Sequence, residues 1–104
     1  MSMIALAYSP CPNHEEAVRL AKVLLERKLI ACANIFPITS VYEWEGKVVE
    51  DGEVVLIAKT SREGFPVLRQ ALEELHPYDV PCILELSGDA NDSYTQWLLA
   101  QVAP

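Results

Sequence analysis

The sequence predicts an α+β fold in which strands and helices alternate along its 104 residues. Apolar runs rich in β-branched residues indicate strands, and two stretches between them carry apolar residues at the spacing of an amphipathic helix. A tight Glu45-Gly46 turn joins two of the strands into a hairpin that lies between these helices. The expected order is strand, helix, strand, strand, helix, strand, with a short helix at the C-terminus.

The first strand and helix are expected at residues 3–9 and 13–29. MIALAYS is a short apolar run that ends at PCPN, which is typical of a buried strand followed by a turn. Asn13 is a suitable N-cap, and Glu16 completes a pattern similar to a capping box. Basic residues at 27–28 are expected in the last helical turn, where they favour the helix dipole. The residues expected on the buried stripe are Ala17, Leu20, Ala21 and Leu24.

Residues 31–44 and 47–60 are expected to form a long hairpin. Pro37 interrupts the first of these strands, which predicts an edge position or a bend. A second irregularity is expected at Asp51-Gly52. The run VVLIA does not alternate between apolar and polar residues, so the second strand should be central and covered on both faces.

The C-terminal half is expected to hold a helix, a strand and a short final helix. The helix falls within 60–76, with Pro66 in its first turn and Pro77 as its stop. The strand is expected at 81–87, and the final helix at 91–102. The apolar stripe of the longer helix comprises Leu68, Ala71, Leu72 and Leu75.

These elements predict a ferredoxin-like split βαβ sandwich, with one domain over residues 1–104, a long β-hairpin and an extra C-terminal helix. The hairpin strands, about 13 residues each, are more than twice the usual mean of about 5–6. Two helices cannot cover a ribbon of that length, and its free edges would promote aggregation unless another chain pairs with them. We therefore expect a closed homo-oligomer, and unusual thermal resistance because folding and assembly would be coupled.

Composition excludes several classes of function. The net charge of −7 argues against a nucleic-acid partner, because binding to phosphates needs an excess of Lys and Arg. The N-terminus carries no basic segment and only a short apolar run, so neither a signal peptide nor a membrane span is expected. Three cysteines without a CxxC pair favour reduced thiols in the cytoplasm.

No enzyme motif is present. The chain has no GxSxG, P-loop or dinucleotide-binding fingerprint, so no organic cofactor is implied. Neither histidine has a serine or cysteine at a spacing that indicates a catalytic dyad. We therefore expect a protein that is not an enzyme.

Several motifs together resemble the CutA divalent-cation tolerance family. They are ACANI, YEWEGK, the KT pair at 59–60, HPYDVP at 76–81 and a late YTQWL, and the match covers nearly the whole chain. The resemblance implies a ferredoxin-like subunit in a tight homotrimer with long strands shared between subunits. It also implies an architecture similar to the nitrogen-regulatory signalling trimers, which bind small ligands between subunits. The family is named for tolerance to copper and other divalent ions, and its members are not established as enzymes.

The resemblance also suggests candidate metal ligands. The copper-associated histidine of the family falls on His76, and Leu75 stands where some members carry a second histidine. The family's ligand cysteine at the end of the first strand falls near Tyr8, and the nearest thiol here is Cys11. Cys82 replaces the glutamate usual after the HPYxxP motif and adds a soft ligand. His76, Cys82 and Cys11 are thus the expected ligands of copper or another divalent cation.

Each of these residues also has a structural interpretation. His76 with a thiolate suits copper or zinc, but its ring could equally satisfy the last carbonyls of the helix that Pro77 stops. Cys82 could be a small hydrophobic residue at the start of a strand, and Cys32 is expected to be buried. Cys11 is expected in an exposed turn beside a helix N-terminus, which would lower its pKa and make it reactive.

Four aromatic residues are candidates for contacts between subunits: Tyr42, Trp44, Tyr78 and Trp97. Tyr42 and Trp44 have the same parity in their strand and share one face of the hairpin. An intersubunit packing surface is favoured over a ligand-stacking surface, because aromatic residues dominate interface cores. Lys59 and Glu43, with Tyr78, could instead line a cleft between subunits.

Two functions from different classes therefore remain open. The first is a trimeric module for metal tolerance or signalling that binds divalent or cuprous ions weakly through His76 and nearby thiols. The second is a trimeric ligand-sensing scaffold whose clefts between subunits hold a small organic anion or a peptide, with incidental metal binding.

Overall fold

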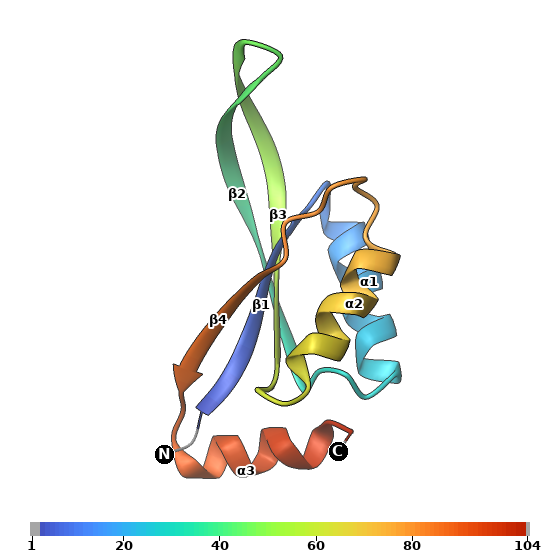
Figure 1. Cartoon of the computed structure of the whole chain (residues 1–104), viewed down its shortest axis with the longest axis vertical. Coiled ribbons are helices and arrows are strands. Elements are labelled where there is room, and N and C mark those ends of the chain that lie inside the picture. The colour runs from blue at the N-terminus through green and yellow to red at the C-terminus, as the bar shows by residue number, and fades with distance from the viewer. Residues whose placement is uncertain (1–2, 104) are drawn as a thin grey trace.

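The computed structural model describes residues 3–103 and confirms the predicted α+β class (Figure 1). Its elements are β1 (Met3–Cys11), α1 (His14–Glu26), β2 (Cys32–Trp44), β3 (Lys47–Ser61), α2 (Phe65–Leu75), β4 (Leu84–Asp89) and α3 (Asp92–Gln101). The strands form one antiparallel sheet in the order β2-β3-β1-β4, which is the ferredoxin-like arrangement.

The helices α1 and α2 lie side by side on one face of the sheet (Figure 1). The main core forms between them and the sheet, from small residues on β1 and larger ones on the helices; its fully buried members include Ala5, Ala7, Leu20, Leu24, Leu56, Leu68 and Leu72. Alanines on β1 let both helices approach the sheet closely. The helix α3 packs at the end of the sheet, where Leu98 joins Ile4 and Ala31 in a second, smaller cluster.

The N-terminus of α1 follows the sequence pattern, but its C-terminus does not. The Asn13 side chain accepts a hydrogen bond from the Glu16 N–H at 2.8 Å, as predicted for an N-cap. The Glu16 carboxylate does not complete a capping box, because it pairs with Arg19. The helix ends at Glu26, so the predicted basic last turn is wrong: Arg27 is the C-cap, and Lys28 lies beyond it with φ 61°.

The hairpin is more regular than predicted. The pairing of β2 with β3 runs without interruption from Cys32 opposite Lys59 to Trp44 opposite Lys47. The predicted irregularity at Asp51-Gly52 is therefore wrong, because an ordinary ladder accommodates both residues. Pro37 lies on the edge strand, as predicted. The turn also follows prediction, with Gly46 at φ 77°.

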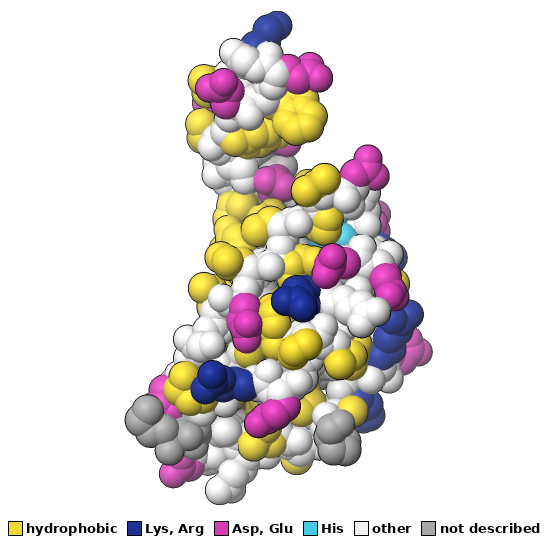
Figure 2. Space-filling view, viewed as in Figure 1, with side chains coloured by type: hydrophobic (Ala, Val, Ile, Leu, Met, Phe, Trp, Pro, Cys, Tyr) yellow, Lys and Arg dark blue, Asp and Glu magenta, His cyan; other side chains and the backbone are white. Residues whose placement is uncertain are grey.

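The outer half of the hairpin projects away from the rest of the chain (Figure 1). The molecule measures 46 × 25 × 20 Å, and its radius of gyration of 14.4 Å exceeds the value of about 13 Å expected for a compact domain of this length. The exposed apolar side chains on this projection are Val41, Tyr42, Trp44 and Val48. Figure 2 shows hydrophobic side chains at the surface both on the hairpin and beside its base.

In the C-terminal half, the start and end of α2 agree with the prediction, but the strand that follows begins later than predicted. Pro66 lies in the first turn of α2, and the helix ends at Leu75. Residues 77–83, which include two prolines, form no regular element, so β4 starts three residues after the expected position at 81. Within residues 3–103, no helix is long and apolar enough to cross a membrane.

Candidate functional site

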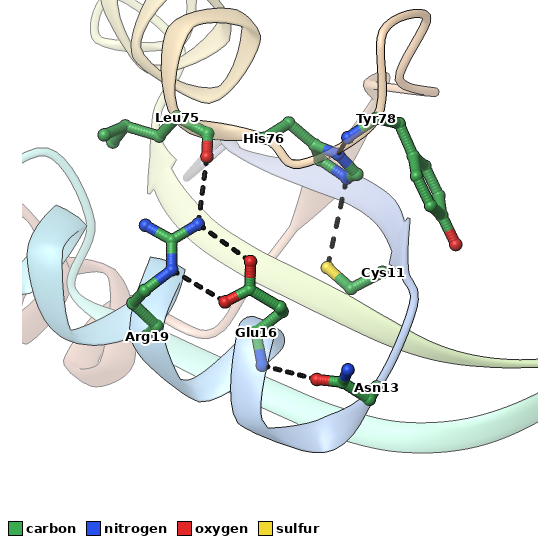
Figure 3. Close-up of polar contacts among 7 residues, drawn as sticks. All are labelled: Cys11, Asn13, Glu16, Arg19, Leu75, His76 and Tyr78. Atoms are coloured by element: carbon green, nitrogen blue, oxygen red, sulfur yellow. Dashed lines mark hydrogen bonds and ion pairs between the residues drawn. The ribbon is translucent and has the colours of Figure 1, made fainter.

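Two of the predicted site residues meet where β1 and α2 end. The Cys11 Sγ lies 4.0 Å from the His76 Nε2, although 65 positions separate the two residues in the chain. The close-up shows the thiol and the imidazole facing each other beneath the segment that follows α2 (Figure 3). The antiparallel sheet carries the end of β1 to this position, and the α1–α2 layer closes over it.

Both nitrogens of the His76 ring have backbone partners. The Nε2 lies 2.9 Å from the Pro10 carbonyl oxygen, and Nδ1 accepts a hydrogen bond from the Tyr78 N–H at 3.1 Å. Because a carbonyl can only accept and an N–H can only donate, these bonds fix a neutral ring protonated on Nε2. Burial lowers the pKa of His76, although the bond to Pro10 opposes that shift.

His76 does not bond the last carbonyls of α2 through its ring, contrary to the structural interpretation of the sequence. Its backbone N–H bonds the Leu72 carbonyl and so ends the helix, while the ring reaches across to β1. The side chain is 7% exposed. His76 therefore connects the end of α2 to the sheet. Its position in the sequence, next to a proline that stops a helix, does not predict this contact.

The prediction of an exposed and reactive Cys11 is wrong. Cys11 is the last residue of β1 and is fully buried. Its Sγ lies 3.6 Å from the Ser9 carbonyl oxygen, to which the thiol donates. Burial, reinforced by the carboxylates of Glu16 and Glu53, raises its pKa to about 11. The proximity of a helix N-terminus is outweighed, because no solvent reaches the sulfur to stabilise a thiolate.

Tyr78 joins this cluster to the base of the hairpin. Its hydroxyl donates to the Glu53 carboxylate at 2.8 Å, and its ring lies 4.9 Å from the His76 ring, centroid to centroid. Burial and the Glu53 carboxylate raise the pKa of Tyr78. The tyrosine is partly buried within the chain, and its polar contact is to β3 of the same chain.

Beside the cluster, Arg19 of α1 forms an ion pair within its own helix and a hydrogen bond that joins α1 to the end of α2. Arg19 donates to both oxygens of Glu16, at 2.8 and 3.2 Å, and also to the Leu75 carbonyl at 3.0 Å (Figure 3). The last bond satisfies one of the carbonyls that a helix C-terminus leaves free. Hydrogen bonding to Arg19 lowers the pKa of Glu16.

Cys82 does not lie in this cluster of side chains. It is exposed, in the irregular segment before β4, so the structural interpretation of Cys82 as a small hydrophobic residue at the start of a strand is wrong. Its carbonyl accepts a hydrogen bond from the Ser9 hydroxyl at 2.7 Å, which places its backbone near the end of β1. Cys32, expected to be buried, is partly exposed. Among residues 3–103, no three His, Cys, Asp or Glu side chains are grouped closely enough to hold a metal ion.

The predicted interface aromatics lie on two parts of the surface. Tyr42 and Trp44 are 42% and 64% exposed on the hairpin, and Trp97 is 46% exposed on α3. Trp97 packs against Tyr94 with ring centroids 5.6 Å apart. Lys59, a candidate for a cleft, lies over the Tyr94 ring at 5.5 Å and so contacts α3 of its own chain.

The sequence did not reveal several residues of the cluster. Pro10 and Glu53 enter the site only because the segment at the end of α2 folds back onto them, so that the His76 ring meets the Pro10 carbonyl and the Tyr78 hydroxyl meets the Glu53 carboxylate. Arg19 was also missed. The i, i+3 spacing of Glu16 and Arg19 was a usable signal for their ion pair, but the bond to Leu75 depends on how α1 and α2 pack.

The contrast between the thiols predicts their order of alkylation. At pH 8, iodoacetamide should modify the exposed Cys82 rapidly and leave Cys11 unmodified until the chain is denatured. A pKa of about 11 leaves Cys11 with roughly a hundredth of the thiolate of a thiol at the reference value of 9.0, and burial protects it further. Peptide mass spectrometry of time points, with Cys11→Ser and Cys82→Ser as controls, measures both rates. Equal rates in the native protein would contradict the buried position of Cys11.

Comparison with a family model, with known sequences and with solved structures gives the same family in each case. A family model described as "CutA1 divalent ion tolerance protein" matches residues 5–101. A divalent-cation tolerance protein CutA from Pyrococcus horikoshii is 41% identical over 97 residues, covering 92% of this chain and 95% of its own. One from Thermus thermophilus is 46% identical over 84% of this chain and 86% of its own. The crystal structure of CutA1 from Ehrlichia chaffeensis superposes with a TM-score of 0.94 at 40% identity, covering 100% of this chain and 99% of that one.

Proposed function

This chain belongs to the CutA1 divalent ion tolerance protein family, and from that premise we propose that it acts in divalent-ion tolerance as a cytoplasmic homotrimer that binds copper weakly. The observation that carries the metal part is the contact between the Cys11 thiol and the His76 imidazole, 4.0 Å apart at the end of β1. Neither a nucleic acid nor a membrane is proposed as a partner. No catalytic activity is proposed, because the family is named for tolerance and not for a reaction.

The pair suits a soft metal ion. Metal–nitrogen and metal–sulfur bonds of about 2.0 and 2.3 Å together span about 4.3 Å, so one ion placed between these two atoms could contact both. A thiolate with an imidazole favours cuprous or cupric copper over hard cations. Cys82 could serve as a third ligand only if its exposed side chain turned toward the pair, because at present only its backbone lies near the end of β1, beside Ser9.

Several features make the proposed binding weak. Metal coordination needs a thiolate, whereas burial raises the Cys11 pKa to about 11. Coordination through the His76 Nε2 also requires that this nitrogen lose its proton and its hydrogen bond to the Pro10 carbonyl oxygen; a proton moved to Nδ1 would oppose the Tyr78 N–H. Two ligands are also fewer than the four that hold a structural zinc ion. Affinity should therefore rise with pH, as the metal competes with fewer protons.

Calorimetric titration with Cu(I) and Cu(II), accompanied by native mass spectrometry, tests the proposal. We expect Cys11→Ser and His76→Asn to lower Cu(I) affinity by roughly tenfold or more, since each removes one of two principal ligands. Cys82→Ser should have a smaller effect, and Cys32→Ser none. Absence of copper binding by the unmodified chain, or an unchanged affinity in Cys11→Ser, would exclude this site.

The second candidate, a ligand-sensing scaffold with incidental metal binding, is favoured by a different observation. His76 already has a structural role, because both its ring nitrogens are bonded to the backbone. On this alternative, His76→Asn destabilises the protein while copper affinity stays constant, and a small anion or a peptide binds between subunits. Measuring stability and copper affinity on the same variant separates the two functions.

A further inference from the structure

A cavity of about 550 Å³ opens at the N-terminal end of α2, whereas His76 follows its C-terminal end. Figure 1 shows the segments that form it: the end of α3, the turn after α1 and the turn between β3 and α2 converge at the end of the molecule opposite the hairpin. The volume lies within the range of about 300–1,000 Å³ usual for small-molecule sites. The aliphatic part of its wall comprises Leu29, Val67, Leu99, Val102 and Ala103.

The polar part of the wall contains a buried hydroxyl without a partner. Thr60 is 1% exposed, and its Oγ1 makes no hydrogen bond to any residue in the described range 3–103. Burying a hydroxyl unpaired costs free energy that a bound polar group would recover. Most such groups in proteins have a partner, so we expect water or a polar group of a bound molecule to occupy the cavity beside the Thr60 hydroxyl.

The same part of the wall favours a negative charge. No carboxylate caps α2, whose N-cap is Gly64, so the positive end of its dipole faces the cavity wall, where the Gly64 N–H donates a hydrogen bond to the Ser61 hydroxyl at 3.0 Å. The Ser61 and Thr60 hydroxyl oxygens both lie 3.0 Å from where a Cβ on Gly64 would be, which places them together beside this helix end. Lys28 contributes a cation.

Lys28 is held at the cavity by its backbone. Its carbonyl accepts a hydrogen bond from the Ala103 N–H at 2.9 Å, which ties the chain after α3 to the turn after α1. One opposing charge is present: the exposed carboxylate of Glu63 also lines the cavity. The wall thus combines a cation, a helix N-terminus that no acidic side chain caps, and two hydroxyls with a larger aliphatic surface.

We propose that this cavity binds a small aliphatic monocarboxylate. The carboxylate lies against Lys28, the Thr60 and Ser61 hydroxyls and the N-terminus of α2, and the hydrocarbon chain packs on the aliphatic wall. This inference goes beyond the proposed metal function and does not depend on it, because no residue of the cavity belongs to the Cys11–His76 pair.

The test is calorimetric titration of the full chain with hexanoate, 1-hexanol and acetate. Hexanoate should bind at least tenfold more tightly than either of the others, because 1-hexanol lacks the charge and acetate lacks the chain. No hexanoate binding at millimolar concentration would overturn the proposal. Equal affinity for hexanoate and 1-hexanol would overturn its anionic part, and hence the proposed class of ligand.

Three variants locate the site. Lys28→Asn removes the positive charge, and asparagine tolerates the positive φ at this position. Thr60→Val removes the hydroxyl at nearly constant volume. Each of these two substitutions should weaken hexanoate binding by about fivefold. Glu63→Gln should strengthen it, because it removes the opposing charge. The control, Lys47→Asn at the hairpin turn, deletes the same charge far from the cavity and should change nothing. An equal loss in Lys47→Asn, or weaker binding in Glu63→Gln, would contradict the assignment.

Discussion

The Trp44→Lys variant is expected to be a monomer at micromolar concentrations at which the unmodified chain forms the proposed trimer. Trp44 is 64% exposed on a hairpin that projects beyond the helices, and Tyr42 lies on the same face of the same strand. Tryptophan and tyrosine are the residues most often found at the energetic centre of interfaces. A lysine at this position would place an unpaired charge in a buried contact, which is strongly unfavourable.

The exposed face extends from the hairpin onto the sheet. Side chains alternate between the two faces along β2, so Phe36 lies on the same face as Trp44. The register of the four strands places Leu84 and Leu86 of β4 on this face too. The helices α1 and α2 cover the opposite face. These leucines are exposed along with Phe36, so an apolar surface runs from the sheet to the hairpin without cover from the two-helix layer. A second copy of the chain is the partner proposed for it.

Light scattering during size-exclusion chromatography measures the assembly, and Leu25→Lys is its matched control. Leu25 is 41% exposed on α1, so the same substitution there should leave the trimer intact. The unmodified chain should also melt at an unusually high temperature that increases with protein concentration, whereas the Trp44→Lys midpoint should not. A monomeric mass for the unmodified chain would refute the assembly.

The His76→Ala substitution is expected to destabilise the fold by about 2–4 kcal/mol, since it removes two partly buried hydrogen bonds and leaves a cavity. The Pro10 carbonyl and the Tyr78 N–H would both lose their partner. The loss should reduce the attachment of the segment after α2 to the end of β1. Urea unfolding, followed by circular dichroism at several protein concentrations, measures the change in the free energy of unfolding.

His14→Ala provides the matched control for this prediction. His14 is exposed at the start of α1, so the same substitution there should change stability by no more than about 0.5 kcal/mol. Equal effects of the two substitutions would mean that the His76 hydrogen bonds contribute nothing to stability.

Acid should weaken the folded state through the same histidine. Because burial lowers the pKa of His76 in the folded chain, the unfolded chain binds the proton more readily below about pH 6.5. The stabilisation from neutral His76 is therefore complete above that pH and is lost as the pH falls toward the folded-state pKa. His76→Ala should lack this component. The charged groups that influence the ring are Glu16, Arg19 and Glu53. Parallel pH dependence in the two proteins would contradict the assignment to His76.

Several elements follow from local sequence patterns. The Asn13 cap, the position of Pro66 in the first turn of α2 and the Gly46 turn need only local residues, and the structure agrees with each. The failures also have local causes. The irregularity predicted at Asp51-Gly52 came from composition alone, whereas the pairing partners on β2 decide whether a ladder continues. Register is a property of two strands.

The candidate site also combines features that the sequence predicts with features that only the tertiary structure determines. The sequence alone identified His76 and the cysteines as groups able to bind a metal, because that depends on the chemistry of their side chains. Only the tertiary structure decided that His76 lies against Cys11 and that Cys82 does not join them. Exposure, and with it the direction of the Cys11 pKa shift, depends on how α1 and α2 pack over β1. Local sequence determined the helices, turns and available chemistry, but solvent exclusion and long-range contacts arise only when distant segments fold together.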